Sequence, residues 1–112
     1  TVVVCGDGSF QMMMNELSTA VGNGIDIKIV LFNNRKLGMV NEIQKKAYSA
    51  GPYAVHMPET PDFCKLAEAF GIESRRIDDE AVMDEAISRM LSFDGPFLLE
   101  CVADSDESTM LQ

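Results

Sequence analysis

Two short apolar runs, each followed directly by a polar sequence, constrain the fold of this chain more than any other feature. The first run is residues 1–5 (TVVVC), followed by residues 6–8 (GDG), and the second is residues 27–32 (IKIVLF), followed by residues 33–34 (NN). Near-continuous apolar runs rich in valine and isoleucine are typical of strands that are covered on both faces of a parallel sheet. The sequence therefore predicts two buried strands with polar residues at their carboxyl ends.

A helical pattern joins the two predicted strands. Ser9 has the kind of side chain that caps helices, and from Phe10 onward apolar residues recur at the spacing of one helix face. This face comprises Phe10, Met13, Met14, Leu17, Ala20 and Val21. Residues 22–24 (GNG) tolerate the left-handed dihedrals that end helices. Strand, helix and strand together have the length of a βαβ unit, whose crossover is almost always right-handed.

Helices and strands continue to alternate along the rest of the chain. The expected elements are a helix over 37–48, an irregular loop over 50–58, a helix with Thr60 as its cap and Pro61 at its first position, a strand over 72–77, a helix capped by Asp78 or Asp79, and a strand over 97–102. The apolar faces of these helices comprise Met39, Val40, Ile43, Phe63, Leu66, Ala67, Phe70, Val82, Met83, Ala86, Ile87, Met90 and Leu91. This alternation predicts an α/β fold, an open parallel sheet flanked by helices, in one domain or part of one.

Composition excludes several classes of function. The formal net charge of −9 argues against a nucleic-acid partner, because binding to a phosphate backbone needs a basic surface. No apolar run approaches the ~20 residues that span a bilayer, and no signal-peptide pattern opens the chain, so we expect no membrane association. Cys5, Cys64 and Cys101 are widely spaced and odd in number. They indicate buried reduced thiols of a cytoplasmic protein rather than a disulfide or a zinc site.

The polar residues after the two strands are candidates for a metal and phosphate site. In open α/β sheets ligands bind at the carboxyl ends of the strands, and neighbouring strands lie only about 5 Å apart. If the two strands are neighbours, the Asp7 carboxylate, the Asn34 amide oxygen and a main-chain carbonyl suit Mg²⁺, which completes its octahedron with waters and phosphate oxygens. The amides of Gly8 and Ser9 open the following helix and offer N–H groups to a phosphate. A Gly-Asp-Gly sequence alone also forms an ordinary turn, and the second polar pair is what favours a site.

Together these sequences resemble the cofactor motif of thiamine-diphosphate-dependent enzymes. Residues 8–12 (GSFQM), 33–40 (NNRKLGMV) and 95–100 (GPFLLE) look like the catalytic subunits of acetolactate synthases, and the resemblance covers essentially the whole chain. It implies that residues 1–112 are the C-terminal part of the diphosphate-binding domain of a three-domain enzyme. The implied cofactors are thiamine diphosphate and Mg²⁺.

The resemblance assigns roles to the residues of both motifs. Asp7 and Asn34 would bind Mg²⁺ through their side chains, and Lys36 would bind it through its backbone carbonyl. Residues 8–9 would contact the diphosphate, and residues 37–40 would line the thiazolium and substrate side. The full set of implied cofactor-binding residues is Gly6, Asp7, Gly8, Ser9, Asn34, Lys36, Leu37, Gly38, Met39 and Val40.

No catalytic residue is assigned within the chain. In enzymes of this family the glutamate that activates the aminopyrimidine belongs to the pyrimidine-binding domain of a partner subunit, so the resemblance implies a homo-oligomer, in some cases with a regulatory subunit. The implied substrates are pyruvate and a second 2-keto acid, in branched-chain amino acid biosynthesis. By itself this chain would be catalytically inactive.

Two other functions remain open. Ile43 stands where many acetolactate synthases carry a tryptophan that lines the substrate channel, so another 2-keto acid decarboxylase or carboligase of the same family is one alternative. A non-catalytic phosphate-binding module that keeps the fold is the other. The presence of both Asp7 and Asn34 argues against the module, because a decayed site has no reason to retain both ligands.

Several conspicuous residues receive structural rather than chemical interpretations. We interpret residues 12–14 (MMM) as packing residues, His56 as a solvated loop residue and Glu16 as an exposed or packing carboxylate. Residues 75–76 (RR) are interpreted as solvated charge at a strand edge, and the acidic tail over 104–112 as solvated and irregular. Asn33 would brace its turn rather than contact the metal.

Overall fold

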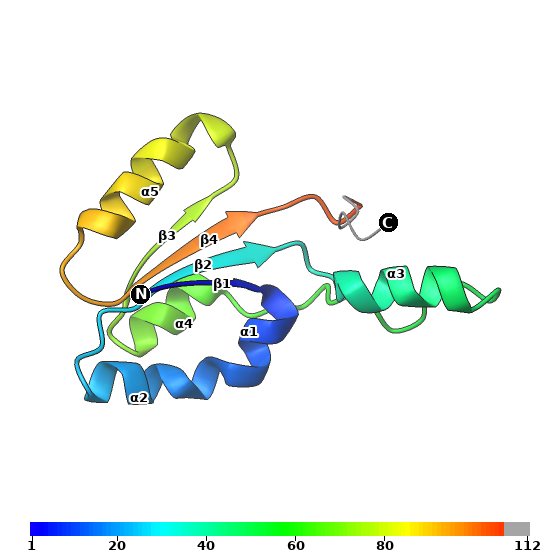
Figure 1. Ribbon diagram of the computed structural model, residues 1–112, viewed down its shortest axis with the longest axis horizontal. Coiled ribbons are helices and arrows are strands. Elements are labelled where there is room, and N and C mark those ends of the chain that lie inside the picture. Colours follow the sequence, from blue (N-terminus) through cyan, green and yellow to red (C-terminus); the bar gives the residue numbers. More distant parts are fainter. Residues whose placement is uncertain (107–112) are drawn as a thin grey trace.

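Four parallel strands form a single sheet in the computed structural model, which describes residues 1–106 (Figure 1). The strands are β1 (Val2–Gly6), β2 (Lys28–Asn33), β3 (Glu73–Ile77) and β4 (Phe97–Val102), and they pair in the order β1-β2-β4-β3. All three pairings are parallel. The predicted α/β fold with an open parallel sheet is therefore confirmed. Of the acidic tail, residues 107–112 lie outside the described residues.

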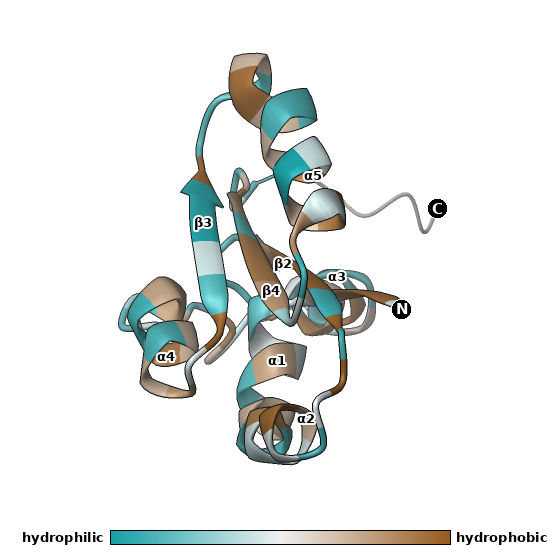
Figure 2. Ribbon diagram, turned by 90° about the vertical axis from the view of Figure 1, so that its left-hand side faces the viewer, coloured by the Kyte–Doolittle hydropathy of each residue, from teal (hydrophilic) through white to brown (hydrophobic). Residues whose placement is uncertain are grey.

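Helices lie on both faces of this sheet. The helical segments are α1 (Asp7–Met13), η1 (Met14–Glu16), α2 (Leu17–Gly22), α3 (Gly38–Ala47), α4 (Phe63–Ala69), η2 (Glu80–Val82) and α5 (Met83–Ser92), of which η1 and η2 are 3₁₀-helices. Figures 1 and 2 show α1, α2 and α4 on one face and α5 on the other. Helix α3 projects beyond the carboxyl ends of the strands (Figure 1). In the described part of the chain, no helix has the length and hydropathy needed to cross a membrane.

Each face of the sheet has its own apolar core, because side chains alternate between faces along a strand. Leu98 of β4 packs in the cluster that contains Phe10 and Phe63, whose rings meet edge to face at 5.6 Å. The next residue, Leu99, packs in the cluster formed with α5. Fully burying one such side chain stabilises the fold by about 1.5–3 kcal/mol. The two cores together fix β2 and β4 as the centre of the sheet.

The first helix differs from its prediction in its start and in its continuity. It begins at Asp7 with Gly6 as its N-cap, so Ser9 lies inside the helix and caps nothing. The 3₁₀ segment η1 then interrupts the helix, and its tighter winding rotates the following residues relative to an ideal stripe. Met12 and Met13, which precede this segment, are 74% and 61% exposed, and only Met14 of the three methionines packs against the core.

Aspartates cap α4 and η2, and the later helices bury less of their apolar faces than predicted. Helix α4 is capped by Asp62, whose carboxylate accepts the Lys65 N–H at 3.2 Å, rather than by Thr60. Asp79, one of two predicted caps, accepts the Ala81 N–H at the start of η2. Ala86 and Met90 of α5 are buried. The apolar residues left exposed on α3 and α5 are Met39, Val40, Ile43, Met83 and Leu91.

Strand β1 is an edge of the described sheet, and it is exposed where the sequence predicted burial. Val2 and Val4 are 51% and 65% exposed, because α5 packs over β3 and β4 and leaves the β1 end of that face open. Phe32 of β2 is 47% exposed on the same side. A groove of about 270 Å³ runs here between α5 and the β1–β2 pair, lined only by apolar side chains, cysteine included. The opposite edge, β3, is largely hydrophilic (Figure 2).

Candidate functional site

The carboxyl ends of β1 and β2 lie side by side and bring the two polar sequences together. Gly6 pairs with Phe32 in the sheet register, so the residues that follow each strand meet at one edge. The Asp7 carboxylate accepts the Gly8 N–H through one oxygen and the Arg35 N–H through the other, both at 2.7 Å. One side chain therefore joins the start of α1 to the loop after β2.

Asp7 is a buried acidic residue with no ion-pair partner among residues 1–106. It is 2% exposed, and within residues 1–106 its hydrogen-bond partners are backbone N–H groups and it forms no ion pair. The other buried charges of the described chain are all paired: Lys28 with Asp26, Lys36 with Asp106, and Glu100 with Arg76. Buried charges in proteins are paired or bind metals, because an unpaired ion in a low-dielectric site is costly. Asp7 is thus the strongest candidate metal ligand in the structure.

The loop after β2 presents further oxygen atoms near Asp7. Arg35 adopts a left-handed conformation (φ 53°), which turns the chain sharply between Asn34 and Lys36. The Asn34 side-chain oxygen accepts the Lys36 N–H at 3.1 Å, and the Lys36 carbonyl accepts the Gly38 N–H at 2.9 Å. Each of these oxygens retains a second lone pair. No group of three His, Cys, Asp or Glu side chains within residues 1–106 forms a metal site, so a cation here would depend on mixed ligands.

Lys36 is a candidate metal ligand through its backbone carbonyl, because its ammonium group binds elsewhere. Its side chain is buried and points to the segment after β4, where Nζ donates to the Ser105 carbonyl at 3.0 Å and lies 3.3 Å from the Asp106 carboxylate. The strand-like segment at Lys36 forms an isolated antiparallel bridge with His56. This bridge ties the loop to the 50–58 segment. The Asp106 side chain is 85% exposed, as predicted for a solvated tail, and it is also the ion-pair partner of Lys36.

Gly8 allows α1 and the loop to touch. A Cβ built on Gly8 would lie 2.6 Å from Leu37 Cδ2, which is far closer than two carbons approach. The absence of a side chain at residue 8 therefore brings Leu37 against the first turn of α1. Of the predicted cofactor residues, Gly6, Asp7, Gly8, Asn34, Lys36, Leu37 and Gly38 gather at this edge of the sheet.

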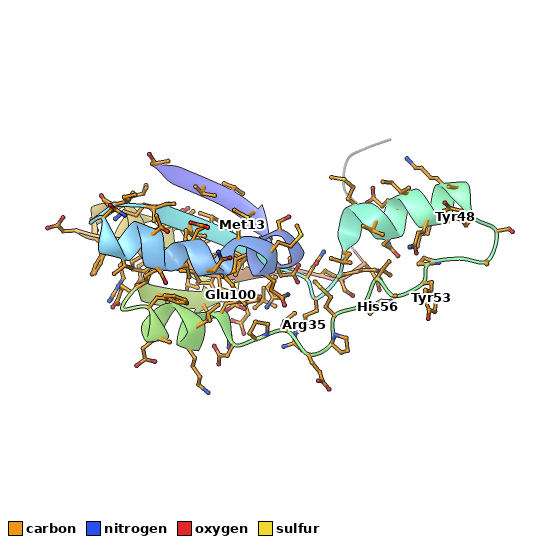
Figure 3. The ribbon with its side chains drawn as sticks, turned by 90° about the horizontal axis from the view of Figure 1, so that it is seen from below. Met13, Arg35, Tyr48, Tyr53, His56 and Glu100 are labelled. Atoms are coloured by element: carbon orange, nitrogen blue, oxygen red, sulfur yellow. The ribbon has the colours of Figure 1, made fainter. Side chains whose placement is uncertain are left out.

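The three remaining predicted cofactor residues are exposed on helices rather than packed in this cluster. Met39 and Val40 are 61% and 42% exposed on α3, which lies beyond the sheet edge, and Ser9 is exposed on α1. His56 is also exposed, as predicted, and Figure 3 shows it beside the base of α3, between Arg35 and Tyr53. An open hollow of about 440 Å³ lies between this segment and the ends of β2 and β4, with Asn34 and Arg35 in its lining.

A buried polar cluster behind the loop was missed by the sequence analysis. Glu100 of β4 is fully buried, and it accepts from Asn33 Nδ2 at 2.7 Å and from Arg76 Nε at 2.8 Å. Arg76 was predicted to be a solvated charge at a strand edge, and its side chain is 44% exposed on the edge strand β3, but it also donates to Glu100, and this hydrogen bond raises the pKa of its guanidinium. The available signal was a single glutamate inside the apolar run 97–102. Asn33 braces the turn, because its Oδ1 accepts the Arg35 N–H at 3.2 Å.

The three cysteines are unpaired, as predicted. Cys101 is buried, whereas Cys5 and Cys64 are half-buried. Burial raises the pKa of all three thiols. They therefore stay protonated at neutral pH and serve as small apolar side chains.

Comparison with known proteins identifies similar sequences and a similar structure. Residues 1–101 match the family described as thiamine pyrophosphate enzyme, C-terminal TPP binding domain. The chain is 41% identical over 110 residues to the acetolactate synthase large subunit of Pyropia yezoensis, covering 96% of this chain and 19% of that protein. It is 37% identical over 107 residues to the acetolactate synthase isozyme 2 large subunit of Escherichia coli K12, covering 96% and 20%.

A solved structure shares the fold. The thiamine diphosphate-dependent 4-hydroxybenzoylformate decarboxylase of Rhodococcus jostii RHA1 superimposes with a TM-score of 0.86 at 26% identity, over 96% of this chain and 20% of that one. The chain thus spans about a fifth of the length of the relatives that it matches.

Proposed function

The chain belongs to the thiamine pyrophosphate enzyme family, as the C-terminal TPP-binding domain that residues 1–101 match, and from this premise we propose that it anchors Mg²⁺ and the diphosphate of the cofactor in a longer enzyme. Thiamine pyrophosphate and thiamine diphosphate are the same compound. When bound, this cofactor supplies carbanion stabilisation, whereas the protein supplies binding, orientation and electrostatics.

The observation that carries the proposal is the buried Asp7 carboxylate, which lacks a cationic partner in the described chain. We assign Mg²⁺ to Asp7, the Asn34 side-chain oxygen and the Lys36 carbonyl. All three are hard oxygen ligands, and they carry only one negative charge among them. Such a set suits an ion that fills its remaining positions with water and substrate phosphate oxygens.

The diphosphate is assigned to the side of the metal formed by α1 and the loop that follows β2. Gly8 and Ser9 lie in the first turn of α1, and helix N-termini offer N–H groups to anions. The Gly8 N–H donates to Asp7 Oδ1 at 2.7 Å, so the Ser9 N–H would donate to the diphosphate and Gly8 would allow its close approach. Leu37 is held against Gly8 and forms the neighbouring wall. We assign Gly38, Met39 and Val40 to the thiazolium and substrate side, which is the side toward which α3 projects.

The longer enzyme is proposed to be an acetolactate synthase. The support is that relatives with this name are 35–41% identical over nearly the whole chain. Such an enzyme decarboxylates pyruvate and condenses the product with a second 2-keto acid, in branched-chain amino acid biosynthesis. The proposed assembly is a cytoplasmic homo-oligomer in which a partner subunit supplies the pyrimidine-binding domain, with or without a regulatory subunit.

A second candidate is a 2-keto acid decarboxylase of the same family. The similarity in fold to a 4-hydroxybenzoylformate decarboxylase supports it, although the sequence identity is lower, at 26%. Formation of acetolactate rather than an aldehyde from pyruvate by the full-length protein would distinguish the two.

The metal assignment is tested by Asp7→Asn in the full-length protein. The substitution retains the size of the side chain and removes its charge, so Mg²⁺-dependent binding of thiamine diphosphate, measured by calorimetry, is expected to be lost. Asp84→Ala, at an exposed position on the opposite face, is the control and should bind normally. Normal binding by Asp7→Asn would refute the assignment, and no binding by the unmodified protein would leave a non-catalytic module.

A further inference from the structure

The buried cluster behind the loop is built around one carboxylate that the proposed function does not use. Glu100 is 0% exposed and stands on β4 beside β2 and β3. One oxygen accepts from Asn33 Nδ2 at 2.7 Å, and the other accepts from Arg76 Nε at 2.8 Å and lies 3.6 Å from Cys64 Sγ. Figure 3 shows Glu100 in the sheet region, to the left of Arg35. Arg76 provides the only opposite charge on Glu100 among residues 1–106.

This carboxylate dictates the orientation of the Asn33 amide. An ionised carboxylate is an acceptor only, so it must face the NH₂ group of Asn33 and not its oxygen. The Asn33 oxygen is thereby turned toward the loop, where it accepts the Arg35 N–H at 3.2 Å. The reverse orientation would place two acceptors against each other inside the protein, and leaving a buried group unsatisfied costs about 1–3 kcal/mol.

The Arg35 N–H connects the buried cluster around Glu100 to the proposed metal site. It is shared between Asn33 Oδ1 and the Asp7 carboxylate, to which it donates at 2.7 Å. Arg35 is also one of two non-glycine residues with positive φ in the described chain, a conformation that surrounding contacts must hold in place. Its neighbours in sequence are Asn34 and Lys36, so the position of this one peptide sets where both candidate ligands point.

We propose that Glu100, paired with Arg76, is a positioning residue for the metal-binding loop: it fixes the Asn33 amide, which holds the left-handed Arg35 peptide against Asp7. This inference rests on the proposed function. Outer-shell residues of this kind orient metal ligands without touching the ion, and their loss typically weakens metal affinity about 10–100-fold.

Adjacent residues of β3 offer a matched control. Arg75 and Arg76 are neighbours on the same strand, and each donates to one glutamate, Arg75 to Glu85 on α5 at 2.9 Å and Arg76 to Glu100. The Arg75 side chain pairs with α5, on the sheet face opposite the loop, and its partner Glu85 is exposed. Arg75→Gln and Arg76→Gln therefore remove the same guanidinium group from the same strand, and only the second reaches the cluster. Arg76 also donates to Asp62 at 3.0 Å, so Asp62→Asn, which weakens that second pair without touching Glu100, separates its loss from the loss of the Glu100 contact.

The first measurement is the Mg²⁺ concentration that gives half-maximal binding of thiamine diphosphate to the full-length protein. Glu100→Gln and Arg76→Gln are expected to raise it by about 10–100-fold, and Arg75→Gln should leave it unchanged. Arg76→Lys keeps the charge without the planar geometry of the guanidinium and should fall between Arg76→Gln and the unmodified protein. Arg76→Lys keeps a positive charge beside the buried Glu100, so this variant tests the inference even if Glu100→Gln or Arg76→Gln does not fold.

The second measurement is amide hydrogen exchange over residues 33–37 in the cofactor-free full-length protein. Exchange is expected to be faster in Glu100→Gln and Arg76→Gln than in Arg75→Gln, because the Arg35 N–H loses one of its two acceptors. Since this readout needs no cofactor, it separates failure of the inference from failure of the proposed function. Unchanged Mg²⁺ dependence and unchanged exchange in the Arg76 variants would overturn the inference and leave Glu100 a purely structural residue.

Discussion

Replacing Gly8 by alanine tests how closely α1 and the metal-binding loop must approach. Gly8 lies inside α1 at a helical φ, so alanine is compatible with the backbone, and Gly→Ala at such a site stabilises a protein by about 0.4–1 kcal/mol. Against this gain stands the contact of the new methyl with Leu37 Cδ2, at 2.6 Å. Carbon atoms pack at about 3.5–4.0 Å, so Leu37 must move by roughly 1 Å.

The two effects can be compared in size. Forcing a methyl group into an occupied space costs about 1–3 kcal/mol, which exceeds the gain from the backbone. We therefore expect Gly8→Ala to destabilise α1 locally by about 0–2.6 kcal/mol, the difference of these ranges, and to displace Leu37 from the proposed cofactor wall. A full-length enzyme of several domains has no single unfolding free energy, so a local measurement is needed.

Hydrogen exchange of the α1 amides supplies that local measurement. Each 1.4 kcal/mol of local destabilisation accelerates exchange about tenfold, so exchange in Gly8→Ala should be up to about seventyfold faster. Gly22→Ala is the control, because Gly22 is also helical and a Cβ there meets nothing within 4 Å. Gly22→Ala should slow exchange in its own segment. If Gly8→Ala slows exchange equally and binds thiamine diphosphate normally, Leu37 yields freely and the close approach has no importance.

Three further predictions concern single side chains. Lys36→Met removes the ammonium group that donates to the Ser105 carbonyl but keeps the backbone carbonyl of residue 36, the proposed metal ligand. Mg²⁺ affinity should therefore persist, while amide hydrogen exchange over 103–106 accelerates. Lost affinity would show that the Lys36 side chain itself is needed for metal binding. Asp62→Ala removes the cap of α4, which is expected to cost about 0.5–2 kcal/mol of local stability in α4 by hydrogen exchange, with Asp62→Asn as the control that retains the cap. The Lys65 backbone N–H lowers the pKa of Asp62, so its contribution is present above the usual pKa of an aspartate and is lost as the pH falls below it; α4 exchange that shows no acid dependence would contradict this. Burial raises the pKa of Cys101, so alkylation by iodoacetamide at pH 8 should be slower in the native protein than in urea, and equal rates would exclude a protected thiol.

The parallel sheet was predictable because its signals are local. The run 97–102 forms β4 with the predicted bounds, since its apolar residues and the preceding Gly-Pro turn act over a few positions. The meeting of Asp7 with the loop after β2 also follows, because neighbouring parallel strands end at the same edge of a sheet. These inferences need the order of residues along one strand and nothing from distant parts of the chain.

Other features depend on contacts between distant residues, which periodicity does not report. The hydrogen bond between Arg76 and Glu100 joins β3 to β4, which are neighbours only because the strand order is β2-β4-β3. Without that order, the sequence predicts only that the two adjacent arginines are solvated. The exposure of Met39 and Val40 arises because α3 projects past the sheet instead of packing on it. The 3₁₀ segment at 14–16 likewise has no distinct signature in its sequence.

The open end of the sheet has a practical consequence for any study of the site. β1 offers a free row of backbone N–H and C=O groups together with protruding valines at Val2 and Val4. A short, uncharged, valine-rich segment without proline is the kind that stacks into cross-β assemblies when nothing shields it. We therefore expect residues 1–112, when produced on their own, to form fibrillar aggregates that start at β1. These aggregates would reduce the amount of folded protein that can bind the cofactor. A lysine at Val4, which is 65% exposed on this edge strand, would act as a gatekeeper and slow their growth.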